Sequence, residues 1–316
     1  MTQGCARFYK ATLFPPMTTH RVPFVVGDEC FETFVTLFGN LNSATDSPSH
    51  STPTVVLHGG PGLSHDYLLP LADLAPSTGP IILYDQLGSG QSSSLVGRGA
   101  KFINIELFIR ELENLLAFFN ISSRYNLIGH SWGATLANEF IVRRGASGLH
   151  RYVLQNGLAS AALRNNAIAA LRKGLPEDIQ MTLQTCEASG ATDTQAYTDA
   201  MDIWYHRHSC RINPFPPELQ RSFDARLNDP TVWDVIRSGP EQMGSGWDIR
   251  DKIHLMRHVP TLLINGEFDY MTDEVVKPFF FGIDKIKWVK FPESSHMPHI
   301  EERESYMSIV GDFLKD

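Results

Sequence analysis

Short runs of consecutive apolar residues recur along this chain, and most are separated by stretches in which apolar positions follow a helical spacing. The apolar runs that predict buried strands lie at residues 54–57, 81–84, 125–128, 152–154, 260–266 and 287–291. Runs of this kind are typical of strands covered on both faces, as in a parallel sheet. Segments 67–74, 105–119 and 134–142 predict the intervening helices. The pattern therefore predicts an α/β fold with a mostly parallel sheet flanked by helices.

The pattern changes at two places. Residues 22–26 and 31–38 predict a two-stranded hairpin ahead of the first buried strand. From residue 158 to residue 246 the strand pattern stops, and the chain predicts helices at 161–173, from 176 onward, at 194–208 and at 217–227. We therefore expect a helical cap at 158–246 inserted into a core made of residues 1–157 and 247–316. Caps of this kind shape a pocket and exclude water.

One pentapeptide carries the candidate chemistry. Residues 129–133 read Gly-His-Ser-Trp-Gly, which is the G-x-S-x-G pattern of a nucleophile elbow. A predicted strand precedes it and a predicted helix follows it, as the motif requires. We expect Ser131 to be the nucleophile, and a serine hydroxyl needs a base within hydrogen-bond reach.

The chain order that goes with this motif is serine, then acid, then histidine. Asp269 follows the predicted strand at 260–266, and His296 follows the one at 287–291. Because sites lie at the carboxyl ends of parallel strands, we expect Asp269 as the acid and His296 as the base. Asp273, at the start of a predicted helix, and His299, beside the last helix, are the weaker alternatives.

Two backbone N–H groups usually hold the oxyanion of acyl transfer. One belongs to the residue after the nucleophile, which is Trp132. The other comes from a loop after an early strand. Residues 58–62 read His-Gly-Gly-Pro-Gly directly after the strand at 54–57, and we expect the Gly60 N–H to be the second donor. The competing interpretation is that this glycine-rich segment is only a tight turn.

Composition narrows the classes of partner. The formal net charge of the 316 residues is −8 and no basic cluster occurs, so we expect no nucleic-acid partner. No apolar stretch reaches 18 residues, and residues 1–16 lack the apolar segment of a secretory signal, so we expect no membrane span and no leader. Four scattered cysteines without a C-x-x-C pair suggest free thiols in the cytoplasm. Metal-binding and nucleotide-binding motifs are lacking too, so we expect no metal and no cofactor.

The motifs together resemble the proline iminopeptidases of the α/β-hydrolase superfamily, and most closely the branch that includes the tricorn-interacting factor. The matching stretches are residues 58–68, 84–92, 129–134, 247–249, 266–269 and 295–296. The resemblance implies an α/β-hydrolase core with a cap, and a serine exopeptidase that removes an N-terminal residue, often proline, from short peptides or amides. It also implies the same three catalytic residues.

The resemblance further implies carboxylates that hold the free amine of the substrate. Glu241 lies in a Gly-Pro-Glu stretch similar to the family's cap motif, with one residue missing. The branch carries a second glutamate directly after the catalytic aspartate, where this chain has Tyr270. Glu267 lies nearby, although bracing of the loop is an equally simple role for it. We also expect Phe268, Trp132 and Trp204 as candidates for an apolar pocket, although core packing is the simpler role of each aromatic residue taken alone.

We therefore expect a serine hydrolase that forms an acyl-enzyme with a small peptide, amide or ester substrate. Its best substrate is a short peptide or amino-acid amide with an N-terminal proline or small apolar residue. Tyr270 motivates a first alternative, an esterase, amidase, lactonase or cyclase that acts on a small molecule. The second alternative is a non-catalytic binding protein on the same fold. The sequence leaves the oligomeric state open.

Overall fold

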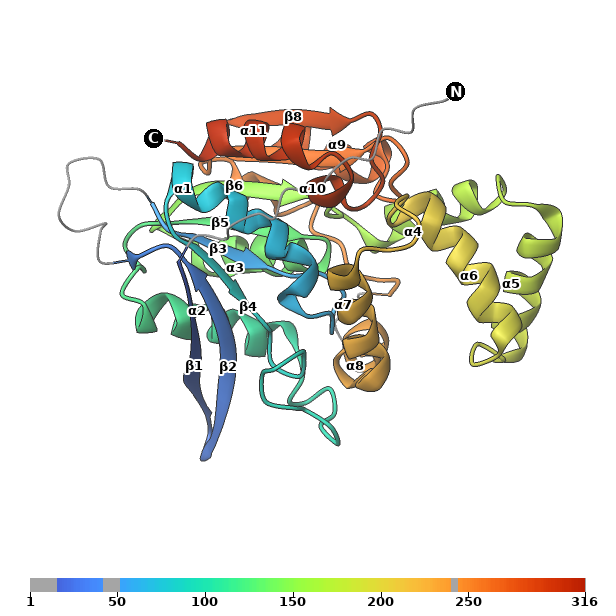
Figure 1. Ribbon diagram of the computed structural model, residues 1–316, viewed down its shortest axis with the longest axis horizontal. Coiled ribbons are helices and arrows are strands. Elements are labelled where there is room, and N and C mark those ends of the chain that lie inside the picture. Colours follow the sequence, from blue (N-terminus) through green and yellow to red (C-terminus); the bar gives the residue numbers. More distant parts are fainter. Residues whose placement is uncertain (1–15, 42–51, 240–243, 316) are drawn as a thin grey trace, which may run out of the picture.

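A computed structural model describes residues 16–41, 52–239 and 244–315. In this part of the chain an eight-stranded sheet runs in the order β1-β2-β4-β3-β5-β6-β7-β8 (Figure 1). The strands are β1 (Met17–Val26), β2 (Glu29–Phe38), β3 (Thr54–Leu57), β4 (Ile81–Tyr84), β5 (Tyr125–His130), β6 (Leu149–Gln155), β7 (Thr261–Gly266) and β8 (Ile286–Phe291). Strand β2 pairs antiparallel with β1 and β4, and every other pairing is parallel. The predicted hairpin and mostly parallel sheet are thus confirmed.

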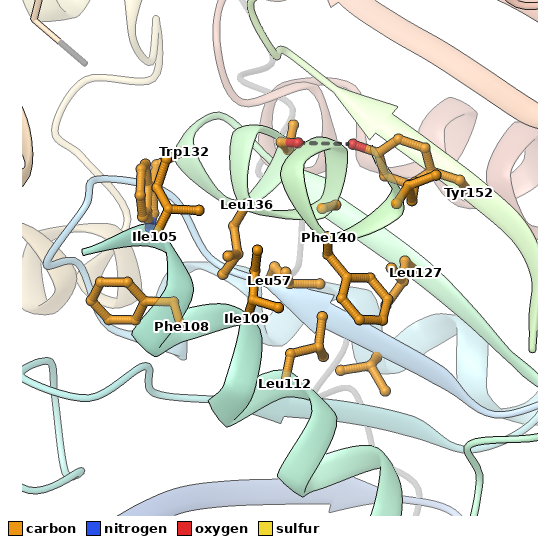
Figure 2. Packing of buried hydrophobic residues seen from close by; sticks show 14 of the residues in the cluster. Leu57, Ile105, Phe108, Ile109, Leu112, Leu127, Trp132, Leu136, Phe140 and Tyr152 are labelled. Atoms are coloured by element: carbon orange, nitrogen blue, oxygen red, sulfur yellow. Dashed lines mark hydrogen bonds between the residues drawn. The ribbon is translucent and has the colours of Figure 1, made fainter. Parts of the chain in front are cut away.

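The central strands are buried on both faces, which explains their uninterrupted apolar sequence. Val55 and Leu57 join one hydrophobic cluster, whereas Val56 between them joins another, because successive side chains of a strand point to opposite faces. Helices α2 (Ile105–Phe118), α3 (Trp132–Arg144) and α9 (Asp273–Gly282) pack in the first cluster. The second holds η2 (His65–Leu74) and α11 (Arg303–Leu314). Figure 2 shows the first cluster, with Leu57 and Leu127 of the sheet facing α2 and α3.

The segment expected as a helix at 67–74 forms a 3-10 helix instead. Pro70 lies inside η2 and has no backbone N–H to donate. The tighter coil also holds most of its apolar residues in the core, since Tyr67, Leu68 and Leu71 are fully buried. The α2 prediction is confirmed, and the Asn104 side chain caps it by accepting the Leu107 N–H at 3.0 Å.

Helices fill the stretch expected to form the cap. They are α4 (Ala161–Arg172), α5 (Glu177–Ser189), α6 (Gln195–His208), α7 (Pro217–Asn228) and α8 (Thr231–Ser238). Figure 1 shows α4, α5 and α6 on the side toward which the arrows of β6 and β8 point. The pattern did not predict α8, and the division into cap and core stays a prediction.

The longest described helices, α2 and α6, have 14 residues each, and none in the described ranges combines the length and apolar character needed to cross a bilayer.

Candidate active site

Ser131 occupies a strained turn between β5 and α3. Its backbone angles, φ 55° and ψ −115°, are unusual for a residue with a side chain. The N–H of Ser131 donates to the Gln155 carbonyl at 3.0 Å, which ties the turn to the end of β6. Strain of this kind persists only where the surroundings hold it, and it is common at functional sites.

The glycines on either side of the turn are required by close contacts. A Cβ atom at Gly133 would lie 2.0 Å from the Leu57 carbonyl oxygen, and one at Gly129 would lie 2.7 Å from the Ala134 Cα. Both distances are far inside van der Waals contact. The two flanking positions therefore admit only glycine, because helix α3 starts against the ends of β3 and β5.

The Asp269 carboxylate holds the imidazole of His296. Nδ1 of His296 lies 2.8 Å from Oδ1 of Asp269, and both side chains are buried. Oδ1 also accepts the Met271 N–H at 2.9 Å, while Oδ2 accepts from Nδ2 of Asn156 at 2.6 Å. A carboxylate so bound accepts from Nδ1–H of His296, which leaves Nε2 as the acceptor atom of the ring.

The two alternative residues lie elsewhere. Asp273 is the first residue of α9, where it accepts from Asn265 at 2.9 Å and from Lys290 at 3.2 Å. His299 is fully buried between Gln155 and the Tyr67 carbonyl. Burial lowers the pKa of His299 to about 3, so this ring is neutral and serves as a structural link.

The glycine-rich loop after β3 passes beside the serine. A Cβ atom at Gly59 would lie 3.1 Å from the Cβ of Ser131. Gly60 has φ +117°, which a side chain disfavours, and a Cβ atom there would meet the backbone nitrogens of Gly62 and Leu63 at 2.8 Å. Trp132 is the first residue of α3, so its N–H has no partner within the helix. Both expected donors thus lie on segments adjacent to Ser131.

The indole of Trp132 points into the core. Figure 2 shows it beside Ile105 and Phe108, and the Phe108 ring meets it edge-on at 5.9 Å. Its Nε1–H donates to Oε1 of Gln86 at 2.8 Å. Because the side chain is only 3% exposed, core packing accounts for it better than lining a pocket does.

The expected substrate-binding residues are dispersed. Glu267 is exposed and pairs with Lys290 at 2.6 Å, and Phe268 lies under the Arg211 guanidinium, 3.7 Å from its ring centre. Trp204 is buried on α6, and its ring centre lies 6.5 Å from that of Tyr270. Glu241 lies outside the described residues.

Tyr270 contacts the candidate catalytic residues directly. Its hydroxyl lies 3.0 Å from Nε2 of His296, and its ring stacks on the imidazole with centres 4.4 Å apart. Burial raises the pKa of Tyr270, and a hydrogen bond with the Ser131 side chain lowers it in part. The phenol is therefore neutral and lies within hydrogen-bond reach of His296.

Sequence reasoning missed several polar residues that organise the site. Asn156 binds Asp269, and Tyr67 and His130 connect the loop at Gly59 with the backbone of His296. The only sequence signal for Asn156 is that a polar pair, Gln155 and Asn156, follows an apolar strand at the edge where sites lie. His130 is the variable second residue of the elbow motif, so the motif itself gives it no role.

Comparisons with known proteins agree with this geometry. Residues 52–303 match the α/β hydrolase fold family. A curated proline iminopeptidase of Thermoplasma volcanium is 32% identical over 83% of this chain and 88% of its own length. A crystal structure of proline iminopeptidase from Mycobacterium smegmatis is 33% identical, with a TM-score of 0.83, over 94% of this chain and 97% of that one. The crystal structure of VinJ is 37% identical, with a TM-score of 0.86, over 95% of this chain and 99% of that one.

These likenesses extend across both the sheet and the helices α4–α8, and the expected resemblance is confirmed. The family match covers most of the chain, and curated relatives exceed 30% identity over most of their lengths. This chain is a hydrolase that belongs to the proline iminopeptidase family of the α/β-hydrolase superfamily.

Proposed function

We propose that this chain removes the N-terminal residue, proline or a small apolar residue, from short peptides or amino-acid amides. Ser131 is the nucleophile, His296 the general base and acid, and Asp269 the residue that orients His296. The N–H groups of Gly60 and Trp132 hold the oxyanion. The relatives named proline iminopeptidase support the substrate class.

The reaction proceeds in two halves. Nε2 of His296 takes the Ser131 proton while Oγ bonds to the carbonyl carbon, and the negative charge on the carbonyl oxygen is held by the two N–H groups. The C–N bond then breaks, and His296 gives its proton to the leaving amine. In the second half water attacks the acyl carbon, His296 takes its proton, and Ser131 leaves with that proton.

The observation that carries the proposal is the pair formed by Asp269 and His296. Nδ1 of His296 lies 2.8 Å from Oδ1 of a carboxylate whose other oxygen is bound by Asn156. This arrangement leaves Nε2 as the basic atom, on the side where the Tyr270 hydroxyl lies. A buried carboxylate that fixes the ring in this tautomer is what a general base needs, and the strained turn at Ser131 supplies the candidate nucleophile.

Recognition of the free amine falls to Glu241 in this proposal. An N-terminal amine has a pKa near 8 and is largely protonated at pH 7, so a carboxylate gives it a charge-assisted hydrogen bond. Glu267 is already paired with Lys290, and Tyr270 is neutral. Glu241→Gln should therefore raise KM for free-amine substrates while the acylation of an N-acetylated substrate is unchanged.

The test compares kcat/KM for a proline arylamide with that for its N-acetylated twin, with Ser131→Ala as the control. We expect the free amine to be preferred by about a hundredfold, which corresponds to a charge contact of roughly 3 kcal/mol. Equal or better turnover of the acetylated twin would overturn the aminopeptidase assignment.

Tyr270 favours the second candidate, a hydrolase of small-molecule esters, amides or lactones with the same three catalytic residues. A phenol beside the reactive atoms, in place of a carboxylate, suits a neutral substrate better than an ammonium group. Faster turnover of simple esters than of free-amine arylamides, lost in Ser131→Ala, would select this candidate.

The described cysteines, Cys30, Cys186 and Cys210, are free thiols, which supports the cytoplasmic location that we also propose.

A further inference from the structure

The Tyr270 hydroxyl occupies a place that the reaction needs. It lies 3.0 Å from Nε2 of His296, on the loop that follows β7, and the Ser131 side chain is close enough to influence its pKa. Among the described residues, Tyr270 is the hydrogen-bond partner of Nε2, and Ser131 is not. Nδ1–H of His296 donates to Asp269, which leaves Nε2 as an acceptor, so the phenol donates to Nε2. The lone pair that must take the serine proton is already engaged.

The leaving nitrogen and the attacking water need the same position. Each must come within about 2.6–3.2 Å of Nε2, since His296 exchanges a proton with both. Each must also lie next to Oγ of Ser131, because the bond that breaks or forms is at the acyl carbon. A hydroxyl that already lies 3.0 Å from Nε2 excludes another hydrogen-bonding atom from that position.

We propose that Tyr270 is a specificity-determining residue whose hydroxyl, in the free enzyme, blocks the contact between Nε2 of His296 and the Ser131 hydroxyl. A substrate then reacts only when its leaving-group side displaces the Tyr270 hydroxyl from Nε2. The inference rests on the proposed function of Ser131. It adds a condition on the substrate, which must supply a group that replaces the phenol at Nε2.

The ring of Tyr270 connects this contact to the helices α4–α8. Tyr270 packs against the large cluster of the sheet and also against a small cluster formed by Leu175, Leu183, Ala200 and Trp204. Nδ1–H of His208, on α6, donates to the Phe268 carbonyl at 2.8 Å and so binds α6 to the same loop. A movement of Tyr270 away from His296 therefore shifts contacts with α6, which gives this helix an influence on access to the serine.

The phenol is suited to a replaceable contact. Burial raises the pKa of Tyr270, so the group stays protonated and does not act as a base at neutral pH. A hydrogen bond between neutral groups is weak, and a substrate nitrogen or a water can take its place at Nε2. A carboxylate in this position would bind the protonated imidazole much more firmly.

The experiment compares the second-order rate of Ser131 labelling by a small fluorophosphonate in the wild type, Tyr270→Phe and Tyr205→Phe. Tyr205→Phe is the matched control, because Tyr205 packs against the same small cluster and stacks on Phe223. We expect Tyr270→Phe to label about three- to tenfold faster, which matches the loss of one ordinary hydrogen bond, and Tyr205→Phe to label at the wild-type rate. Tyr270→Leu, which also removes the ring, should label faster as well, and melting temperatures show whether each variant folds.

Two results would overturn the inference. Labelling of Tyr270→Phe within twofold of the wild type means that the hydroxyl is not a barrier. Labelling slower by a hundredfold or more means that the hydroxyl carries the proton between Ser131 and His296. If the folded wild type does not label at all, as in a Ser131→Ala control, the proposed function fails first, and the two failures are thereby distinguished.

Discussion

The hydroxyl of Tyr67 lies 2.6 Å from Nδ1 of His130 and 2.6 Å from the backbone nitrogen of Gly59. The Gly59 N–H can only donate, so the phenol oxygen accepts this hydrogen bond, and the phenol O–H donates a hydrogen bond to Nδ1 of His130. Nε2–H of His130 then donates to the His296 carbonyl at 2.9 Å. Burial lowers the pKa of His130 well below its usual value, which agrees with a neutral ring. A single chain of bonds thus links the glycine-rich loop to the backbone of the candidate base.

Removal of the Tyr67 hydroxyl should loosen this link. We expect Tyr67→Phe to lower kcat about tenfold with little change in KM, because the buried hydrogen bonds to Gly59 and His130 are lost and the loop with Gly60 is no longer held beside Ser131. Tyr152→Phe is the control, since the Tyr152 hydroxyl is equally buried but bonds to Ala134 and Asn138. A similar loss of kcat in both variants would attribute the effect to general destabilisation.

Asn156 should be needed for activity because it binds the buried Asp269. Its φ of 49° favours glycine, so Asn156→Gly removes the side chain without backbone strain. We expect kcat/KM to fall about 10- to 100-fold, the range for loss of a hydrogen bond to a charged group. The matched control is Asn120→Gly, at an exposed position with φ 54°, which should keep full activity. Wild-type kinetics in Asn156→Gly would show that Asp269 needs no such support.

Gly133 should tolerate no side chain. Gly133→Ala would place a methyl group 2.0 Å from the Leu57 carbonyl oxygen, and backbone must shift to relieve that contact. We expect a loss of about 3 kcal/mol or more in the free energy of unfolding in urea, or an insoluble product. Gly99→Ala is the control, because nothing lies within 4 Å of its added Cβ. Equal stability of the two variants would contradict the close packing of α3 on β3.

Glu111 should make stability depend on pH. Burial raises the pKa of Glu111 to about 8, although hydrogen bonds from Thr33 and from the Leu87 N–H oppose the rise. Between its ordinary value of 4.5 and about 8, the unfolded chain has lost this proton while the folded chain keeps it. Stability from this group therefore falls as pH rises through that window.

The measurement is the melting temperature at pH 5 and pH 8 for the wild type, Glu111→Gln and Glu113→Gln. Because other groups titrate as well, the difference between variants is the informative quantity. We expect Glu111→Gln to gain stability relative to the wild type as the pH rises, by several degrees at pH 8. Glu113→Gln, at a partly exposed position paired with Arg144, should follow the wild type. Parallel curves for all three proteins would mean that Glu111 titrates normally.

Local sequence was sufficient for much of the fold. The buried strands were predictable because a strand covered on both faces must be apolar at every position, as in β3 and β4. The turn at Ser131 was predictable because a strained turn between a strand and a helix requires glycine on both sides. Asp269 and His296 followed from the ends of β7 and β8, since parallel strands bring their carboxyl ends to one edge.

The remaining features depend on segments that only folding brings together. Asn156 and Asp269 are 113 residues apart, and His130 and the His296 carbonyl are 166 apart, so neither contact leaves a local pattern. Tyr270 could be seen in the sequence as a departure from the family, but its contact with Nε2 of His296 required the folded loop. Hydrophobic periodicity specifies which residues are buried, whereas hydrogen bonds among buried polar groups are specified by distance and direction. For that reason the chain pattern alone indicated the scaffold and the candidate nucleophile, and only the packed structure showed how the site is held and which hydroxyl contacts Nε2 of His296.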